Sequence, residues 1–237
     1  MMMNENEMIR DAFKHKSWNE IKTENSWQIF KVVAEFVEGF EQLARIGPSV
    51  AVFGSARTKP ENKYYQMAEE IGFLLTQLGY GVITGGGPGI MEAANKGAQR
   101  GKGKSIGINI TLPHEQAANP FIDPDKLISF EYFFARKTMF MRYAQGFIVL
   151  PGGFGTFDEL FEALTLIQTG KIGRFPIVLV GVNYWSGLIT WIKEVMHAEE
   201  HNVSITDFDL FHLVDTADEA VKLIDRFYGQ FLLSPNF

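Results

Sequence analysis

A strand, a glycine-rich turn and a helix follow one another in residues 147–162, and this order restricts the fold more than any other stretch of the chain. Residues 147–150 are a continuous apolar run, which is typical of a fully buried strand. The run stops at Pro151, glycines follow, and an amphipathic helix is predicted to begin at Thr156. Unobstructed backbone N–H groups at a helix start bind anions such as phosphate. The stretch therefore predicts a buried strand that leads into an anion site.

Two further predicted strands end in turns of the same kind. Residues 49–53 stop at Gly54-Ser55, residues 81–84 stop at the run 85–89, and a predicted helix follows each turn. Successive strand–turn–helix units imply right-handed crossovers and a parallel sheet, so the turns are expected on one edge. We predict a doubly wound α/β sheet that binds its ligand at the carboxyl ends of its strands.

The composition restricts the class of protein. The chain has 237 residues, of which 46% are hydrophobic and 21% charged, as expected for one folded α/β domain with an extension. A net charge of -6 argues against a sequence-independent binder of nucleic acid polymers and favours a small ligand. No cysteine is present, which excludes disulfides, thiolate metal sites and cysteine nucleophiles. The amino terminus lacks a secretory pattern and no run reaches membrane-spanning length, so we expect a cytoplasmic protein without a membrane partner.

The amino-terminal part is predicted to be an extension of one main domain. Residues 1 to about 25 are polar, and an amphipathic helix of about 18 residues is predicted from Ser26 to a stop at Gly47-Pro48. We expect its apolar stripe to cover an edge of the core, with an oligomerisation helix as the alternative. The predicted domains are thus 1–47, an arm and helix, and 48–237, the main α/β domain that carries the predicted ligand site. Further helices are predicted at about 61–78, 90–100, 134–145, 156–170 and 185–200, and after Thr216.

The glycine turns do not match the common nucleotide motifs. The run 85–89 has contiguous glycines interrupted by proline, which departs from Gly-x-Gly-x-x-Gly, and no Walker lysine follows it. At the third turn, Thr156 and Glu159 have the spacing of a capping box, which is the structural alternative to a functional role. Asp158, Glu159 and Glu162 are spaced so that at least two carboxylates share a helix face. Carboxylates beside a phosphate turn suggest a ligand whose other end is a sugar.

Basic and histidine residues supply the remaining candidates. Arg136 and Lys137 precede the third strand–turn–helix unit, where they either grip an anion or form a solvated basic face. The segment from His197 to His201 fits the His-x-x-Glu-His pattern of zinc proteases. We interpret it as a coincidence, because it lies at a predicted helix end and no third ligand is indicated. No metal is expected.

Three motifs together resemble the Lonely Guy family. They are residues 85–95 (Gly-Gly-Gly-Pro-Gly-Ile-Met-Glu-Ala-Ala-Asn), 135–137 (Ala-Arg-Lys) and 151–159 (Pro-Gly-Gly-Phe-Gly-Thr-Phe-Asp-Glu). Members are cytokinin riboside 5'-monophosphate phosphoribohydrolases and related nucleoside monophosphate nucleosidases, long labelled possible lysine decarboxylases. The resemblance covers about residues 50–196 and makes this chain one of the longer members. It implies a Rossmann-like fold, a homodimer or higher homo-oligomer, and a site near the subunit interface.

The resemblance also implies roles for individual residues. Arg136 and Glu159 match the catalytic arginine and glutamate of the family. Asp158 stands where compact members often carry a second glutamate, which leaves its role open; Glu92 and Glu162 are secondary candidates with it. The residues expected to bind the nucleotide and its phosphate are Gly54, Ser55, Gly86, Gly87, Met91, Lys137, Gly152, Gly153, Gly155 and Thr156.

The expected reaction is hydrolysis of the N-glycosidic bond of a purine nucleoside 5'-monophosphate, with an N6-modified adenine as one candidate base. The products are the free base and ribose 5-phosphate, and no cofactor is expected. A departing base leaves positive charge on the ribose, which the Glu159 carboxylate would stabilise. Two alternatives remain: a nucleotide-binding regulatory protein without turnover, and, as the weakest, a lysine decarboxylase that carries pyridoxal phosphate on Lys137.

Overall fold

The computed structural model describes the backbone of residues 18–111 and 118–229. The chain divides into two compact units, residues 1–38 and 39–237. Helix α2 (Trp18–Leu43) runs across the division. It begins before the predicted start at Ser26. The apolar residues of the predicted stripe differ in burial along the helix. In the first unit Trp27, Ile29, Phe30, Val33 and Val37 are exposed, whereas Leu43 is buried within the second.

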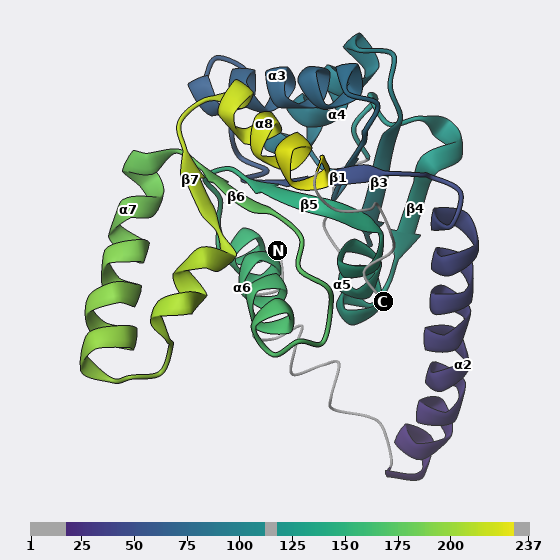
Figure 1. The fold of residues 1–237 in the computed structure, drawn as a ribbon. Coiled ribbons are helices and arrows are strands. Elements are labelled where there is room, and N and C mark those ends of the chain that lie inside the picture. The colour runs from purple at the N-terminus through teal and green to yellow at the C-terminus, as the bar shows by residue number, and fades with distance from the viewer. Residues whose placement is uncertain (1–17, 112–117, 230–237) are drawn as a thin grey trace, which may run out of the picture. The chain divides into compact units, whose positions relative to one another are not determined.

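The second unit is built on a seven-stranded sheet of order β4-β3-β2-β1-β5-β6-β7 (Figure 1). Every neighbouring pair of strands is parallel. The strands are β1 (Ser49–Phe53), β2 (Gly81–Thr84), β3 (Ser105–Ile110), β4 (Leu127–Phe130), β5 (Ala144–Val149), β6 (Ile177–Val180) and β7 (His212–Val214). The predicted doubly wound α/β fold is confirmed.

Helices cover both faces of this sheet, with α3, α4 and α8 on one face and α5 and α6 on the other (Figure 1). The helices are α3 (Lys63–Gln77), α4 (Ile90–Arg100), α5 (Phe133–Tyr143), α6 (Phe154–Gln168), α7 (Val182–Trp191) and α8 (Ala217–Tyr228). Short helical segments are η1 (Pro124–Lys126), η2 (Ile192–Glu199) and η3 (Ile205–Leu210). Local sequence sets several starts: Asn62 caps α3, and Thr216 with Glu219 forms the capping box of α8. None of the described helices is both long and apolar enough to span a bilayer.

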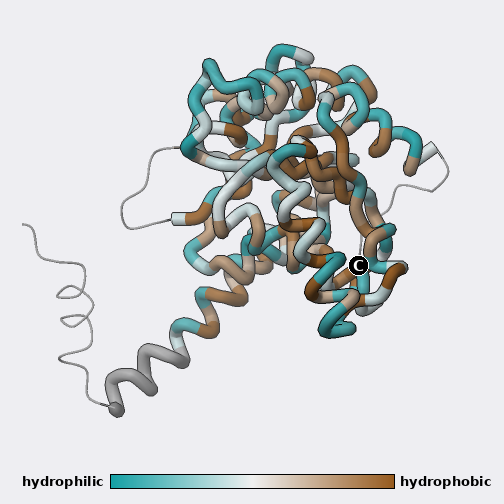
Figure 2. The backbone as a smooth tube through the Cα atoms, turned by 90° about the vertical axis from the view of Figure 1, so that its left-hand side faces the viewer, coloured by the Kyte–Doolittle hydropathy of each residue, from teal (hydrophilic) through white to brown (hydrophobic). Residues whose placement is uncertain are grey.

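The core has two layers because the central strands bury both of their faces. On one side, side chains of β1, β2, β5 and β6 pack with α3, α4 and α8. On the other side, rings of Phe53, Phe140, Phe147 and Phe175 contact one another at centroid distances near 5 Å. Apolar backbone segments gather inside the 39–237 unit, and hydrophilic segments lie on its outer helices and loops (Figure 2). This continuous burial explains why β1 and β5 read as unbroken apolar runs.

The strand order places a switch point between β1 and β5. The chain builds β1 to β4 outward in one direction and then returns to pair β5 with the other side of β1. In doubly wound sheets the crevice at such a point, at the carboxyl ends of the strands, is the usual ligand site. The turns after β1 and β5 lie there.

Two predicted boundaries near this point are wrong. Helix α6 begins at Phe154 and not at Thr156; its N-cap is Gly153, and no side chain caps it. The predicted capping box of Thr156 and Glu159 is therefore absent, because Glu159 lies too far into the helix to reach the N-cap. Strand β5 begins at Ala144 and ends the predicted helix 134–145 early. The second residue of this strand is the polar Gln145, so no apolar run marks the start of β5. Gln145 is nevertheless buried, and its backbone carbonyl accepts a hydrogen bond from the Tyr228 hydroxyl at 2.5 Å.

Candidate active site

The turn after β1 holds the other two glycine turns together. The Ser55 N–H donates to the Pro151 carbonyl (3.0 Å), and the Ile90 N–H donates to the Ser55 carbonyl (3.1 Å). Gly89 has a φ of +68°, and a Cβ there would lie 2.4 Å from the Ser55 oxygen. Gly89 is thus required by conformation and by close approach. The prediction that the three turns share one edge of the sheet is confirmed.

The glycines of the third turn do not all have a structural reason. A Cβ at Gly152 would lie 2.0 Å from Thr156 Oγ1, so packing requires glycine there. Gly153 and Gly155 differ, because a Cβ at either would meet nothing within 4 Å. Neither has a positive φ. Glycine at these two positions keeps the start of α6 open, as close approach of a ligand to the backbone requires.

Glu159 and Arg136 form a buried ion pair beside this turn. Glu159 Oε1 lies 3.4 Å from Arg136 Nη2, and the glutamate is only 2% exposed. Its other oxygen, Oε2, is buried without a hydrogen-bond partner in the part of the chain that the structure describes. Burial raises the pKa of Glu159 to about 7, against the opposing effect of the Arg136 and Lys137 charges. A carboxyl group that titrates near neutral pH is suited to acid–base work or charge stabilisation.

The Arg136 guanidinium also lies next to the second glycine turn. A Cβ at Gly85 would lie 3.9 Å from Arg136 Nη1 and 2.8 Å from Met91 Sδ. Met91 Cε lies as close to Gly87, 2.7 Å from the Cβ position there. The structure therefore brings Met91, Arg136 and Glu159 together where the second and third glycine turns approach one another.

Lys137 is held by two carboxylates of α6. Its Nζ lies 2.8 Å from Asp158 Oδ1 and 2.6 Å from Glu162 Oε2. Burial acts to lower the pKa of Lys137, but the hydrogen bonds to Asp158 and Glu162 outweigh it and raise the pKa. Pyridoxal phosphate needs a lysine that readily loses its proton to form a Schiff base. Because the pKa of Lys137 is raised, this lysine does not suit a Schiff base with pyridoxal phosphate.

Other predicted candidates lie outside this cluster or contact different partners. Glu92 Oε1 accepts a hydrogen bond from the Tyr65 hydroxyl at 2.7 Å. His197 and His201 each place Nδ1 within 2.9 Å of a backbone carbonyl, of Val203 and of His197 respectively. Among the described residues, no group of three or more metal-binding side chains is found.

Three residues that contact the glycine turns were missed by sequence analysis. Thr84 and Asn119 contact the second turn, and the Tyr184 hydroxyl donates to the Gly152 carbonyl at 2.6 Å. These residues come from segments far apart in the chain. No local spacing marks them, except that Thr84 directly precedes the glycine run.

The fold and the cluster of glycine turns define a doubly wound α/β protein with a candidate ligand site at one edge of its sheet, and comparison with known proteins identifies the family. Residues 91–224 match the model of the family described as "Possible lysine decarboxylase". The chain belongs to this family, the one that also contains the Lonely Guy proteins.

Curated relatives in this family carry the name cytokinin riboside 5'-monophosphate phosphoribohydrolase. The protein of that name from Mycobacterium marinum is 32% identical over 177 residues, which cover 73% of this chain and 91% of the relative. The one from Mycobacterium tuberculosis is 30% identical over 179 residues, with the same coverage of 73% and 91%.

Solved structures with this fold include a molybdenum cofactor binding protein and a molybdenum cofactor carrier protein. The molybdenum cofactor binding protein from Rippkaea orientalis has a TM-score of 0.56 at 20% identity and covers 76% of this chain and 96% of its own. The carrier protein from Chlamydomonas reinhardtii has a TM-score of 0.56 at 22% identity, with coverage of 77% and 99%. At such identity the likeness concerns the fold alone.

Proposed function

We propose that the protein hydrolyses the N-glycosidic bond of a purine nucleoside 5'-monophosphate. The observation that carries this proposal is the buried Glu159 carboxylate, opposed by Arg136, at the edge where the three glycine turns meet. The names of the family relatives, phosphoribohydrolases of a nucleoside monophosphate, support the same reaction.

In this reaction the bond between ribose C1' and the base nitrogen breaks, and a bond from C1' to a water oxygen forms. The base leaves with the electron pair and takes up a proton, and water loses one, so the products are free base and ribose 5-phosphate. Positive charge builds on the ribose as the base departs. Ionised Glu159 stabilises this charge and orients the water or the ribose hydroxyls. Arg136 supplies a guanidinium for phosphate, ribose or leaving base.

The remaining residues bind and position the nucleotide. The open backbone at Gly153 and Gly155, at the start of α6, supports their role in holding the 5'-phosphate. Met91 with Gly86 and Gly87 lines the other side of the nucleotide, next to Arg136. Lys137 fixes the carboxylates of Asp158 and Glu162 beside Glu159. Binding of the remote phosphate fixes the reacting carbon against the water.

We also propose that the protein is a cytoplasmic homodimer whose interface includes the starts of α5 and α6. Phe133, Phe134 and Phe154 are large apolar side chains that are exposed there, Phe154 to 97%. Phe154 also lines a groove of about 480 Å³ together with Phe157, Phe161 and Leu166 and with the polar Lys137, Asp158, Glu162 and Thr165. Exposed apolar patches of this kind mark association sites. Light scattering in solution would contradict the dimer if it gave the mass of one chain, 26.8 kDa.

The pH dependence of turnover follows from the pKa of Glu159. Because burial raises this pKa to about 7, the ionised form is lost as pH falls below that value. We expect kcat/KM for AMP to fall about tenfold per pH unit on the acidic side of about 7. Substrate phosphate also titrates near pH 6. Lys137→Met separates the two: it removes a charge that lowers the Glu159 pKa, so the acidic limb should move to higher pH. If the acidic limb does not move in Lys137→Met, the titrating group is the substrate phosphate and not Glu159.

Alanine at Gly153 or Gly155 is expected to impair nucleotide binding without harming the fold. A Cβ at either position meets no protein atom within 4 Å, so Tm should stay the same or rise slightly. The methyl group would instead meet the bound phosphate, and KM for AMP should rise about tenfold or more. Gly187→Ala is the matched control, because this glycine of α7 also has open space around it. An unchanged KM in Gly153→Ala and Gly155→Ala would show that the phosphate of AMP does not bind at this turn.

A panel of nucleotides tests the proposed function. The purified protein is incubated with AMP, IMP, GMP, CMP and N6-isopentenyl-AMP, and free base and ribose 5-phosphate are followed by chromatography. Release from purine nucleotides supports the proposal and ranks the bases. Binding without release from any of the five would make the chain a non-catalytic nucleotide-binding protein.

A further inference from the structure

A network of buried polar side chains lies directly behind the second glycine turn. Its members, which we call the turn network, are Thr84, Asn95, Ser105 and Asn119, and each is buried. They come from the end of β2, from α4, from the start of β3 and from the segment after β3. Buried polar groups destabilise a fold unless hydrogen bonds satisfy them. Apolar side chains at these positions would avoid that cost, so we expect the polar side chains of the network to have a specific role.

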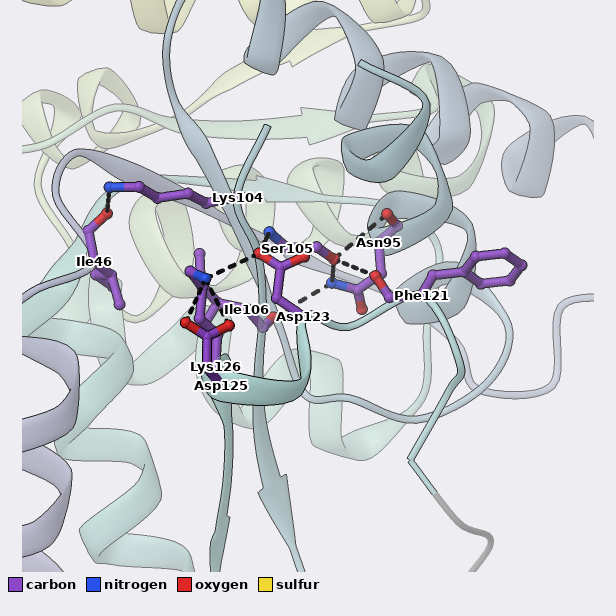
Figure 3. A network of polar contacts seen from close by, with 9 residues as sticks. All are labelled: Ile46, Asn95, Lys104, Ser105, Ile106, Phe121, Asp123, Asp125 and Lys126. Atoms are coloured by element: carbon purple, nitrogen blue, oxygen red, sulfur yellow. Dashed lines mark hydrogen bonds and ion pairs between the residues drawn. The ribbon is translucent and has the colours of Figure 1, made fainter. Parts of the chain in front are cut away.

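Asn95 is the centre of the turn network, and its amide uses its full hydrogen-bonding capacity. Its Oδ1 accepts from Thr84 Oγ1 (2.6 Å) and from Asn119 Nδ2 (3.0 Å). Its Nδ2 donates to Ser105 Oγ (2.9 Å) and to the Ile106 carbonyl (3.3 Å). Figure 3 shows Asn95 and Ser105 joined in this way, with Ser105 Oγ donating onward to the Phe121 carbonyl (2.6 Å). A side chain with four partners has one orientation.

The turn network ends on the backbone of the glycine turn. Thr84 Oγ1 accepts a hydrogen bond from the Gly86 N–H at 3.0 Å. Asn119 Nδ2 donates to the carbonyls of Gly86 (3.1 Å) and Gly87 (3.0 Å), and the Asn119 N–H donates to Gly86 as well (2.8 Å). Gly86 has a φ of +76°, so these bonds hold a conformation that few other residues adopt.

The same turn lies next to the proposed catalytic pair, Arg136 and Glu159. The position that a Cβ on Gly85 would take lies 2.8 Å from Met91 Sδ and 3.9 Å from Arg136 Nη1, so both side chains lie next to this turn, and Arg136 is the partner of Glu159. A shift of the turn would change the space beside the guanidinium and the nucleotide. Displacements of about 1 Å in such supports cost roughly a hundredfold in rate.

We propose that Thr84, Asn95 and Asn119 are positioning residues: they fix the turn at Gly85–Gly87 so that Arg136 and the nucleotide are correctly placed. This inference rests on the proposed function for its kinetic consequence, although the ordering of the turn is independent of it. None of the three residues is expected to touch the reacting atoms.

Thr84→Val tests the proposal, because valine keeps the shape and removes the hydroxyl that the Gly86 N–H needs. We expect kcat/KM for AMP to fall about 10- to 100-fold, and amide hydrogen exchange in a peptide covering Gly85–Gly87 to become at least about tenfold faster. Thr84→Ser restores the hydroxyl and should restore both. Ser49→Ala is the matched control: its hydroxyl is also buried, at the opposite end of the sheet, where it donates to the Gly47 carbonyl.

The two readouts separate the possible failures. An active wild type with unchanged kinetics and unchanged exchange in Thr84→Val would overturn the inference and leave the proposed function intact. Faster exchange at the turn in a wild-type protein without turnover would overturn the proposed function and retain the ordering of the turn. Equal losses in Thr84→Val, Thr84→Ser and Ser49→Ala would show general destabilisation and would also overturn the inference.

Discussion

Glu159→Gln is expected to lower kcat for AMP at least about a thousandfold while AMP still binds. Glutamine keeps the size of the side chain and one acceptor oxygen towards Arg136, so the fold of the site is retained. It cannot carry the negative charge that the ribose requires when the base leaves. Stopped assays with chromatography give kcat, and calorimetry gives AMP affinity. Glu162→Gln is the control, because it removes a carboxylate of the same helix that pairs with Lys137 and not with Arg136.

The same substitution should stabilise the protein at alkaline pH. Burial raises the Glu159 pKa from an ordinary 4.5 to about 7, so between these values the native state holds a proton that the unfolded chain has lost. The free energy of unfolding therefore falls as pH rises through this window. Glutamine has no such dependence, and Glu159→Gln should be more stable by about 2 to 3 kcal/mol at pH 8 and nearly equal at pH 4. Equal urea midpoints at pH 8 would contradict the burial of a charged Glu159.

Arg136→Met is expected to have the second largest effect. It leaves the Glu159 carboxylate buried without its opposite charge, which raises the Glu159 pKa further and removes a guanidinium from the site. Turnover of AMP should fall about 100- to 1000-fold near pH 7. The variant should lose about 2 to 4 kcal/mol of stability at pH 8, since an unpaired buried charge is strongly destabilising. Urea unfolding at pH 8 and 5 measures this loss, which should shrink at the lower pH where Glu159 is neutral.

A double substitution separates loss of charge pairing from loss of packing. Arg136→Met with Glu159→Gln removes both charges, so most of the stability lost in Arg136→Met at pH 8 should return. Lys96→Met is the control partner, because Lys96 is paired with Glu69 on the other face of the sheet. If the double variant is as unstable as Arg136→Met alone, Arg136 acts through packing against Phe133 and Phe140, whose rings lie 5.1 and 5.9 Å from its guanidinium carbon.

The fold and the meeting of the turns could be predicted because their signals are local. Buried parallel strands appear as short apolar runs, and the runs of β1, β2 and β5 stop at glycine turns. Parallel pairing then brings the carboxyl ends of the strands to one edge, without any knowledge of side-chain contacts. Helix α4 was predicted with the bounds Ile90–Arg100 that the structure has.

The arrangement within the site could not be predicted in the same way. The spacing of Thr156 and Glu159 fits a capping box, but the N-cap is Gly153, so Glu159 is the sixth residue of α6 and turns towards Arg136. Arg136 and Lys137 are neighbours in the sequence. On a helix they point about 100° apart, and each finds different carboxylates. Such contacts depend on where α5 packs against α6, which no local pattern contains.

Joint measurement of adenine and ribose 5-phosphate from AMP tests the central claim most directly. The account predicts that the wild-type protein releases both products in equal amounts and that Glu159→Gln binds AMP but releases neither at a comparable rate. AMP bound by the wild type without cleavage, or cleaved equally fast by Glu159→Gln, would contradict it.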